Sequence, residues 1–265
     1  MKLNASKKIT IVLLLCYLPF QGMAWGLLGH RIVGEIADRH LTKKARRGIA
    51  SILGNESPAI SSNWADFIKP DSNYNYLSNW HYINFKAGMS QEAVISYLEK
   101  DTATNAYTRI KFLSSQLKKA NLLQADKVLY LRMLIHLVGD IHQPLHVGRP
   151  EDLGGNRVRV LWFNESYNLH QLWDDVLVSF QKLSYTEYAT AINFSSKEER
   201  KAWQQEPMSL WFYNSYQLAE KIYGDVVGKE DKLGYTYNYK YKALMEDQLL
   251  KGGVHLAGML NEIFN

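Results

Sequence analysis

Two histidine–aspartate pairs are the residues of this sequence whose types and spacing most clearly suit chemistry. His136 and Asp140 lie four positions apart, and His170 and Asp174 repeat that spacing. On an α-helix, side chains at positions i and i+4 share one face, with Cβ atoms about 5–6 Å apart. Imidazole and carboxylate are ligands that zinc takes in proteins, so each pair could supply two ligands to one ion.

A single pair with this spacing usually forms only a hydrogen bond between an imidazole N–H and a carboxylate, or arises by chance. The surroundings of the first pair favour a metal ion instead. Asp140 follows the strongly apolar segment 128–138, and a buried aspartate is costly unless it is paired or bound to a metal. His146 comes just after Pro144, which helps to end this segment, so its imidazole can meet the second pair.

The remaining histidines divide into further candidates and bystanders. Asp66 and His81 bring two more potential ligands. His142 lies two residues beyond the first pair and therefore points elsewhere on the helix, so we interpret it as supporting a ligand or the helix itself. His40 and His255 have no acidic partner at helical spacing, and we expect them to be ordinary surface or core residues.

Residues 1–24 have the pattern of a secretory signal peptide. Three lysines precede an apolar run over residues 9–20, and small residues follow at Gly22 and Ala24. This run is too short to span a bilayer, so the sequence predicts a cleaved leader rather than a membrane anchor. We expect cleavage between Ala24 and Trp25, which makes the protein an exported one, either periplasmic or secreted.

The predicted leader changes how composition and charge are interpreted. The chain has 265 residues and a formal net charge of +5, and the leader holds three of its 31 basic residues and none of its 26 acidic ones. The mature chain then has 28 basic and 26 acidic residues, a net charge of +2, which does not by itself imply a nucleic-acid partner. Cys16, the only cysteine, also lies in the leader, so stability must come from the core or from bound metal. A lipoprotein signal at Cys16 is the alternative, but leucines replace the small residues that such a signal needs.

Cleavage before Trp25 would create a further ligand. The new α-amino group has a pKa of about 7.7–8.0, and a metal can displace its proton. The amine and the carbonyl oxygen of one residue together form a five-membered chelate ring. His30 follows five residues later, near the start of a predicted helix, so the mature N-terminus and this imidazole could bind one ion.

Apart from the leader, the sequence predicts one mainly α-helical domain over residues 25–265 with a small β-hairpin. Segment 128–138 is apolar enough to be a buried central helix. Residues 157–163 alternate basic and apolar side chains behind Gly154-Gly155-Asn156, which predicts a strand or small hairpin. The other predicted helices include residues 32–37, 93–98 and 110–117, a segment from near Leu169, and one or two closing helices over 239–264 around Gly252-Gly253.

The motifs together resemble a known family. They are Trp25-Gly-Leu-Leu-Gly-His30, Trp64-Ala-Asp66, Trp80-His81-Tyr-Ile-Asn84, His136-Leu-Val-Gly-Asp140-Ile-His-Gln-Pro-Leu-His146, Gly154-Gly155-Asn156 and His170-Gln-Leu-Trp-Asp174. Gly253-Val-His-Leu-Ala-Gly-Met-Leu-Asn261 is similar to the last helix of that family. The family is the trinuclear-zinc single-strand-specific nucleases and 3′-nucleotidases, which includes mung bean nuclease and its fungal relatives and belongs to the nuclease/phospholipase C superfamily. The resemblance covers nearly the whole chain after the leader and implies the phospholipase C/nuclease-like helical fold.

The resemblance also implies a ligand set for three Zn²⁺ ions. The first ion would be held by Asp66, His81, His136 and Asp140, the second by the amine and carbonyl of Trp25 with His30 and Asp140, and the third by His146, His170 and Asp174. The two close ions would activate a shared water for in-line attack on phosphorus, and the third would neutralise the O3′ leaving group. The expected substrates are single-stranded DNA and RNA and 3′-nucleotides, and the products carry 5′-phosphates.

Two positions depart from the family pattern. The fungal enzymes carry an arginine three residues after the first aspartate, and here that position is Lys69, which supplies charge but no planar fork. The fungal Phe-x-Asp of the base pocket becomes Tyr82 and Asn84. Tyr82 can stack on a base, while Asn84 offers both a donor and an acceptor. The resemblance thus predicts Asp66 and Lys69 as catalytic residues, and Lys69, Tyr82, Asn84 and Asn156 as substrate-binding residues.

Two other functions fit part of this pattern. A zinc-dependent phospholipase C shares the helical architecture and an N-terminal tryptophan ligand, but its last pair is His-x-x-x-Glu where this chain has Asp174. A non-catalytic periplasmic zinc-binding protein often carries a histidine-rich acidic loop, and this sequence contains none. No segment beyond the leader is apolar enough to cross a membrane, so we expect no membrane partner and see no sign of an obligate protein partner.

Overall fold

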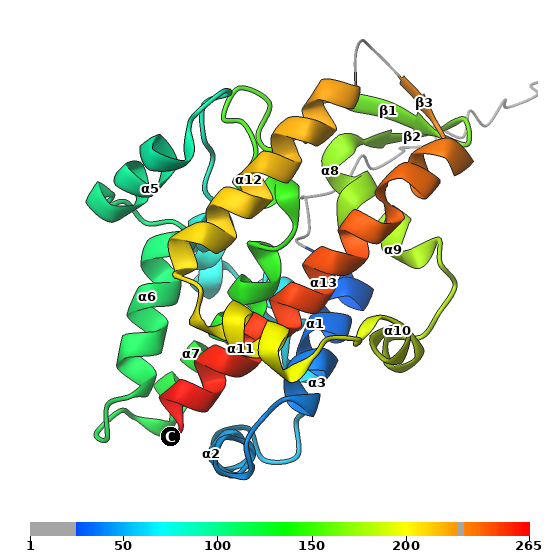
Figure 1. Ribbon diagram of the computed structural model, residues 1–265. Helices are drawn as coiled ribbons and strands as arrows, with labels where there is room; N and C mark the ends of the chain where they lie inside the picture. Colours follow the sequence, from blue (N-terminus) through cyan, green and yellow to red (C-terminus); the bar gives the residue numbers. More distant parts are fainter. Residues whose placement is uncertain (1–24, 227–230) are drawn as a thin grey trace, which may run out of the picture.

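The structure of the protein is a computed structural model that describes residues 25–226 and 231–265 (Figure 1). The described part is mainly helical and carries one small three-stranded sheet, so the predicted helical fold is confirmed. The predicted signal peptide at residues 1–24 lies outside the described residues.

The N-terminal half of the described chain contains helices and no strand. Its α-helices are α1 (Leu27–Arg39), α2 (Lys43–Leu53), α3 (Pro58–Ser61), α4 (Trp64–Phe67), α5 (Gln91–Lys100), α6 (Ala106–Leu117) and α7 (Gln124–Asp140). Two 3₁₀ segments, η1 (Ser72–Trp80) and η2 (Pro144–Val147), lie before α5 and after α7.

The C-terminal half mixes helices with short strands. The strands are β1 (Arg159–Trp162), β2 (Glu165–Asn168) and β3 (Asp231–Leu233). The α-helices are α8 (Leu169–Gln171), α9 (Leu177–Ser179), α10 (Tyr185–Ile192), α11 (Lys197–Gln205), α12 (Met208–Asp225) and α13 (Tyr235–Ile263), and a π-helical turn, η3 (Leu172–Val176), joins α8 to α9.

Helices α1, α7 and α13 pack against one another and form the centre of the molecule. Residues 133–140 of α7 are all buried, as expected of a central helix, although the helix begins at Gln124 rather than near residue 128. In Figure 1, α12 and α13 both run toward the sheet at one end, while α5 and α6 lie on one flank and α10 on the other. This packing gives the last turn of α7 a fully buried position.

The closing segment is one continuous helix, not two. The glycine pair 252–253 lies inside α13, where the neighbouring helices approach closely. A Cβ atom on Gly253 would lie 2.5 Å from the Cβ atom of Ile36 on α1, so a larger residue would force the two helices apart. The pair therefore serves close packing of α1 against α13 rather than a helix break.

The sheet is larger than the predicted hairpin. Strands β1 and β2 form the hairpin, with Val160 paired to Tyr167 in antiparallel register. Phe163 and Asn164 connect them, and their positive φ angles of 49° and 70° suit a two-residue hairpin turn. Strand β3 then pairs with β1 in parallel, with Leu161 opposite Lys232. The sequence did not predict this strand, because three residues are too few to show the alternating pattern of a strand.

Candidate metal centre

The structure gathers the predicted histidine and aspartate ligands into three neighbouring groups. The groups are His30, Asp66 and His136; His81, His136 and Asp140; and His146, His170 and Asp174. Within each group the potential ligand atoms lie within 4.8 Å of one another, and every one of these residues is buried. One difference from the sequence expectation is that Asp66 groups with His30 as well as with His136.

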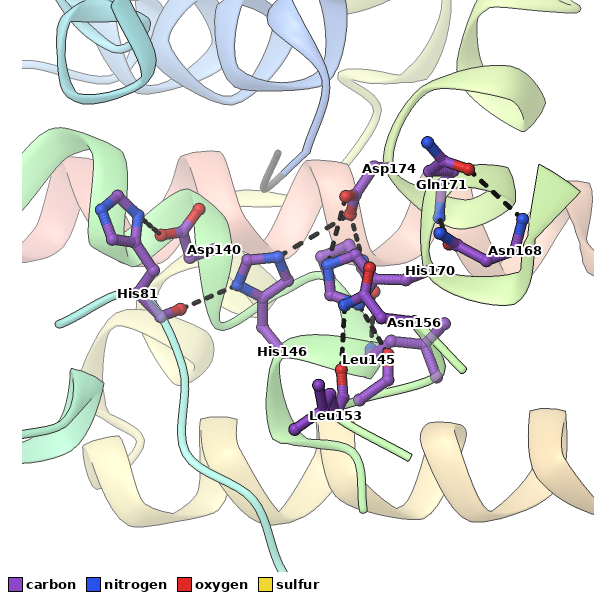
Figure 2. A network of polar contacts seen from close by, with 12 residues as sticks. His81, Asp140, Leu145, His146, Leu153, Asn156, Asn168, His170, Gln171 and Asp174 are labelled. Carbon is purple, nitrogen blue, oxygen red and sulfur yellow. Dashed lines mark hydrogen bonds and ion pairs between the residues drawn. The ribbon is translucent and has the colours of Figure 1, made fainter. Parts of the chain in front are cut away.

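Several parts of the chain, from α1 to η3, deliver these side chains. Helix α1 carries His30, α4 carries Asp66, and His81 directly follows η1. The pair His136–Asp140 occupies the last turn of α7, while η2, α8 and η3 supply the third group. Figure 2 shows His81, Asp140, His146, His170 and Asp174 beside one another.

Asp140 occupies the centre of the first two groups. Its Oδ1 lies 3.2 Å from His30 Nε2, and its Oδ2 lies 3.0 Å from His81 Nδ1 and 3.3 Å from His136 Nε2. The side chain is completely buried. Each carboxylate oxygen thus faces a different imidazole set, which is the arrangement that a carboxylate shared by two ions requires.

The third group combines His146 from η2 with His170 and Asp174, which lie where α8 continues into the π-helical η3. His170 Nε2 lies 3.2 Å from Asp174 Oδ2, and His146 Nε2 lies 3.7 Å from Asp174 Oδ1. A capping box between Asn168 and Gln171 fixes the start of α8 (Figure 2), and the π turn that follows carries Asp174. Such single π turns occur frequently at functional sites because they re-aim side chains within a helix.

Backbone carbonyls orient three of the imidazoles. The Nδ1 atoms of His136, His146 and His170 lie 2.7, 2.8 and 2.6 Å from the carbonyl oxygens of Ser62, His81 and Gly154. An Nδ1–H that donates to a carbonyl leaves the Nε2 lone pair free, and in all three residues Nε2 faces the cluster. This is the tautomer and orientation that a metal-ligating histidine needs.

Several buried polar atoms of the cluster have no hydrogen-bond partner. They are both ring nitrogens of His30, Asp66 Oδ2, Asp140 Oδ1, His146 Nε2 and Asp174 Oδ2. Leaving one such buried group unsatisfied costs about 1–3 kcal/mol, and more if it is charged. Imidazole nitrogens and carboxylate oxygens that face one another without partners fit bound cations, because a cation would satisfy all of them together.

Trp25 lies beside the cluster although its side chain is no ligand. It is fully buried, and the backbone N–H of the next residue, Gly26, donates to the carbonyl oxygen of Asp174 at 2.6 Å. A Cβ atom on Gly26 would lie 2.8 Å from Asp175 Cβ, so this close contact needs glycine. The start of the described chain is therefore attached to the residue that completes the third group.

A cleft of about 490 Å³ opens directly over the cluster. Its lining includes His81, His146 and His170 from the cluster and all four predicted substrate-binding residues, Lys69, Tyr82, Asn84 and Asn156. The Nζ atom of Lys69 lies 2.6 Å from Asp66 Oδ1, so its charge is held at the edge of the metal groups. The ring of Tyr82 is 42% exposed, and Asn156 Nδ2 donates to Leu153 O at 2.9 Å (Figure 2).

Sequence reasoning missed one wall of this cleft. Tyr74, Asn75 and Ser78 of η1 line it, and so does Leu153 on the opposite side. Segment 72–80 has no helical or strand periodicity, so only its unusual content of tyrosine and asparagine could have drawn attention to it.

Comparison with known proteins agrees with this geometry. The S1/P1 nuclease family profile matches residues 25–265. The chain belongs to the S1/P1 nuclease family. Membership makes it a nuclease that acts on nucleic acids, and it favours this function over the phospholipase and zinc-storage alternatives.

The curated relatives of this S1/P1 nuclease come from plants and fungi. Endonuclease 3 of Arabidopsis thaliana is 26% identical over 282 residues, which cover 97% of this chain and 95% of the plant protein. Nuclease P1 of Penicillium citrinum is 25% identical over 265 residues, covering 90% of this chain and 97% of its own. Nuclease S1 of Aspergillus oryzae is 32% identical over 161 residues, covering 57% of this chain and 53% of its own.

The other histidines of this S1/P1 nuclease lie outside the three groups. His142 Nδ1 lies 2.7 Å from Val138 O, and its Nε2 lies 2.7 Å from His255 Nδ1, so His142 links the end of α7 to α13. The partly buried His40 contacts Asn193. An acidic partner of His255, Glu206, lies 3.7 Å away and comes from the segment that follows α11, which helical spacing could not reveal. Among the described residues, no helix has both the length and the apolarity for a membrane span.

Proposed function

We propose that this S1/P1 nuclease is an exported, zinc-dependent endonuclease and 3′-nucleotidase. It hydrolyses the P–O3′ bond of single-stranded DNA and RNA and of 3′-mononucleotides, and leaves 5′-phosphorylated products. The observation that carries the proposal is the convergence of three buried His/Asp groups, with unpartnered ligand atoms, at the floor of a cleft lined by a tyrosine, asparagines and a lysine.

The ligand chemistry favours zinc. Mg²⁺ and Ca²⁺ take oxygen ligands almost exclusively, whereas this cluster contains five imidazoles and three carboxylates. Eight of the proposed zinc ligands are His30, Asp66, His81, His136, Asp140, His146, His170 and Asp174. The ninth ligand residue is Trp25, which would bind through its amine and its carbonyl oxygen. When bound, zinc supplies Lewis acidity toward the phosphate and lowers the pKa of water toward neutrality.

The protein's own side chains bind and orient the substrate. Lys69 is only partly exposed and lies beside Asp66, so its ammonium can neutralise charge that develops on the phosphate. The exposed ring of Tyr82 can stack on a base, and Asn84 and Asn156 offer amides to its polar edge. A base in a duplex is already stacked and paired, so a cleft that holds a base in this way selects single strands.

The test combines metal analysis with substrate assays on the purified mature protein. We expect about three zinc ions per chain, phosphate release from 3′-AMP but not from 5′-AMP, and faster cleavage of single-stranded than of duplex DNA. Hydrolysis of a choline phospholipid without activity on 3′-AMP would instead identify a phospholipase. Full zinc occupancy without turnover of any of these substrates would identify a zinc-binding protein.

Lys69 offers a separate test of phosphate binding. We expect Lys69→Ala to lower kcat on single-stranded DNA by about 10- to 100-fold, because it removes an ammonium held at the edge of the ligand groups. Zinc content should stay unchanged, since Lys69 is no ligand, and Lys69→Arg should keep most of the activity. Steady-state kinetics measures kcat, and elemental analysis measures the zinc content of each variant. An unchanged kcat in Lys69→Ala would show that Lys69 only pairs with Asp66.

The metal-free protein should show an unusual dependence of stability on pH. Burial lowers the pKa of His146, but Asp140 and Asp174 hold its proton more strongly, and its pKa rises to about 9. An unfolded histidine has a pKa of about 6.5, so the folded chain keeps a proton that the unfolded chain releases. This contribution to the free energy of unfolding is complete below about pH 6.5 and is lost as the pH rises to about 9.

We therefore expect the chelated protein to lose on the order of 3 kcal/mol of stability between pH 6.5 and 9. Urea unfolding at the two pH values, with and without chelator, measures it. The zinc-loaded protein is the control, because a metal ion replaces this proton and should remove the loss. Equal stability of the chelated protein at both pH values would contradict the expectation.

A further inference from the structure

A row of aromatic rings leads from the cleft onto the neighbouring surface along η1. Tyr74 lines the cleft and makes an edge contact with Trp64, with ring centroids 5.4 Å apart. Its ring lies nearly parallel to that of Tyr76, at 6.5 Å and 26°. Tyr76 in turn packs edge-on against Trp80 at 5.9 Å and is 54% exposed. Exposed aromatic surface therefore continues from the cleft as far as Tyr76, and Trp80 lies buried behind it.

An arginine lies at the far end of this row, beyond the buried Trp80. The guanidinium carbon of Arg109, on α6, lies 5.6 Å from the centre of the Trp80 ring and 5.1 Å from that of Phe112. Arg109 is half-buried, forms no ion pair within the described parts of the chain, and its Nε is buried without a hydrogen bond. Arg132 also lies over a ring of the row, but Glu56 neutralises it at 2.6 Å. Aromatic packing thus holds Arg109 in place, and no carboxylate among the described residues neutralises its charge.

The charges along the row separate the part that suits a base from the part that suits a phosphate. Burial, followed by the neighbours Tyr74, Tyr130 and Asp126, raises the pKa of Tyr76, so its ring stays neutral and an acidic group lies near it. An anion is disfavoured there, whereas the face of a neutral base is not. A phosphate fits farther along, at Arg109, whose guanidinium can offer paired donors to it.

We propose that Tyr74, Tyr76 and Arg109 form an extended subsite for single-stranded nucleic acid, holding nucleotides beyond the one at the metal centre. Bases stack on the two tyrosines, and a backbone phosphate lies at Arg109. This inference rests on the proposed function. Isolated exposed aromatics are common on protein surfaces, but here the rings continue from the cleft and end at a free cation, which together match the chemistry of a single strand.

The subsite makes substrate length matter. A 3′-mononucleotide fills only the cleft, whereas an oligonucleotide also reaches the row, where stacking of one base on an aromatic ring strengthens binding by about tenfold or more. KM should therefore fall as oligothymidylates lengthen from two to about ten nucleotides, while kcat stays similar.

The experiment compares Tyr76→Ala and Arg109→Ala with the unchanged zinc-loaded protein. Both variants should raise KM for a ten-nucleotide oligothymidylate by about tenfold while leaving 3′-AMP hydrolysis unchanged. Tyr76→Trp should restore the low KM, because it restores a stacking face. Arg109→Ala should also reduce the slope of log affinity against log salt by about 0.7, as expected for one lost phosphate contact with a single strand. Lys111→Ala is the matched control, since this exposed cation lies on the same helix but against Tyr107.

Affinity for a labelled phosphorothioate-linked oligothymidylate, measured by fluorescence anisotropy, tests the subsite without turnover. If the wild-type protein is inactive on every substrate but binds the oligothymidylate, and Tyr76→Ala weakens that binding, the proposed reaction is overturned and the subsite is supported. A KM and an affinity unchanged in both variants would overturn the subsite and leave the reaction standing. Equal losses on 3′-AMP and on the oligonucleotide would also overturn it, because the effect would then belong to the metal centre.

Discussion

Replacing Asp140 with asparagine is expected to remove two of the three proposed zinc ions and to abolish measurable turnover. The Asp140 carboxylate lies within 3.3 Å of His30, His81 and His136, so it is the group that the first two ligand groups share. An asparagine has the same shape but no charge, and its amide nitrogen presents hydrogens where one oxygen faced a ligand group.

The same substitution should destabilise the protein. The carboxylate is completely buried on α7, and removing one partner of a buried charged cluster costs about 3–5 kcal/mol because the others are left uncompensated. Metal binding is also coupled to folding, so the loss of two ions removes a further contribution. Elemental analysis and urea unfolding of the purified variant measure both effects.

Asp247→Asn provides the matched control for Asp140→Asn. Asp247 is 45% exposed and forms a surface pair with Lys251 at 2.8 Å, and such pairs contribute about 0–1 kcal/mol. This control should keep its zinc and its activity. An Asp140→Asn protein that retains three zinc ions per chain would refute the shared role of this carboxylate.

The second large effect is expected at the N-terminus. Residues left in front of Trp25 should lower activity by about 100-fold or more, because an acylated nitrogen no longer offers the lone pair of a free amine. Zinc content should fall by one ion per chain. Trp25 is fully buried and the backbone N–H of Gly26 donates to the carbonyl oxygen of Asp174, so the structure leaves little room for added residues before Trp25.

The measurement uses three versions of the protein. One is exported and processed naturally, one keeps a short tag directly before Trp25, and one carries the same tag after Asn265, which is exposed. Only the N-terminal tag should reduce kcat and zinc content. Mass spectrometry of the natural form should show that it begins at Trp25. Normal turnover of the N-terminally tagged form, or a mature chain that begins elsewhere, would rule out the amine as a ligand.

Much of the candidate centre could be predicted because its signals are local. The spacing of His136 and Asp140 fixes both side chains on one face of α7, and that relation depends only on helix geometry. Burial of an aspartate within an apolar segment is likewise visible before any packing is known. The motifs from Trp25 to Asp174 then identified a family that the profile match confirms.

The way in which the segments meet could not be predicted from spacing. Asp66 joins His30 because α4 and α1 both pack against α7, and His146 reaches Asp174 through the turn after α7. Strand β3 pairs with β1 across more than sixty residues of chain, and Gly253 lies at a helix crossing rather than a helix end. Each relation depends on contacts between elements, which no periodicity along the chain encodes.

The sequence by itself determined the ligand types, their pairing on single helices and the family. The tertiary structure alone decided that Asp66 groups with His30, where the cleft opens, and that Tyr76 and Arg109 extend it along η1 and α6. The reason is physical: side-chain spacing within one helix is fixed by covalent geometry and backbone hydrogen bonds, whereas distances between helices are set by the packing of the whole core.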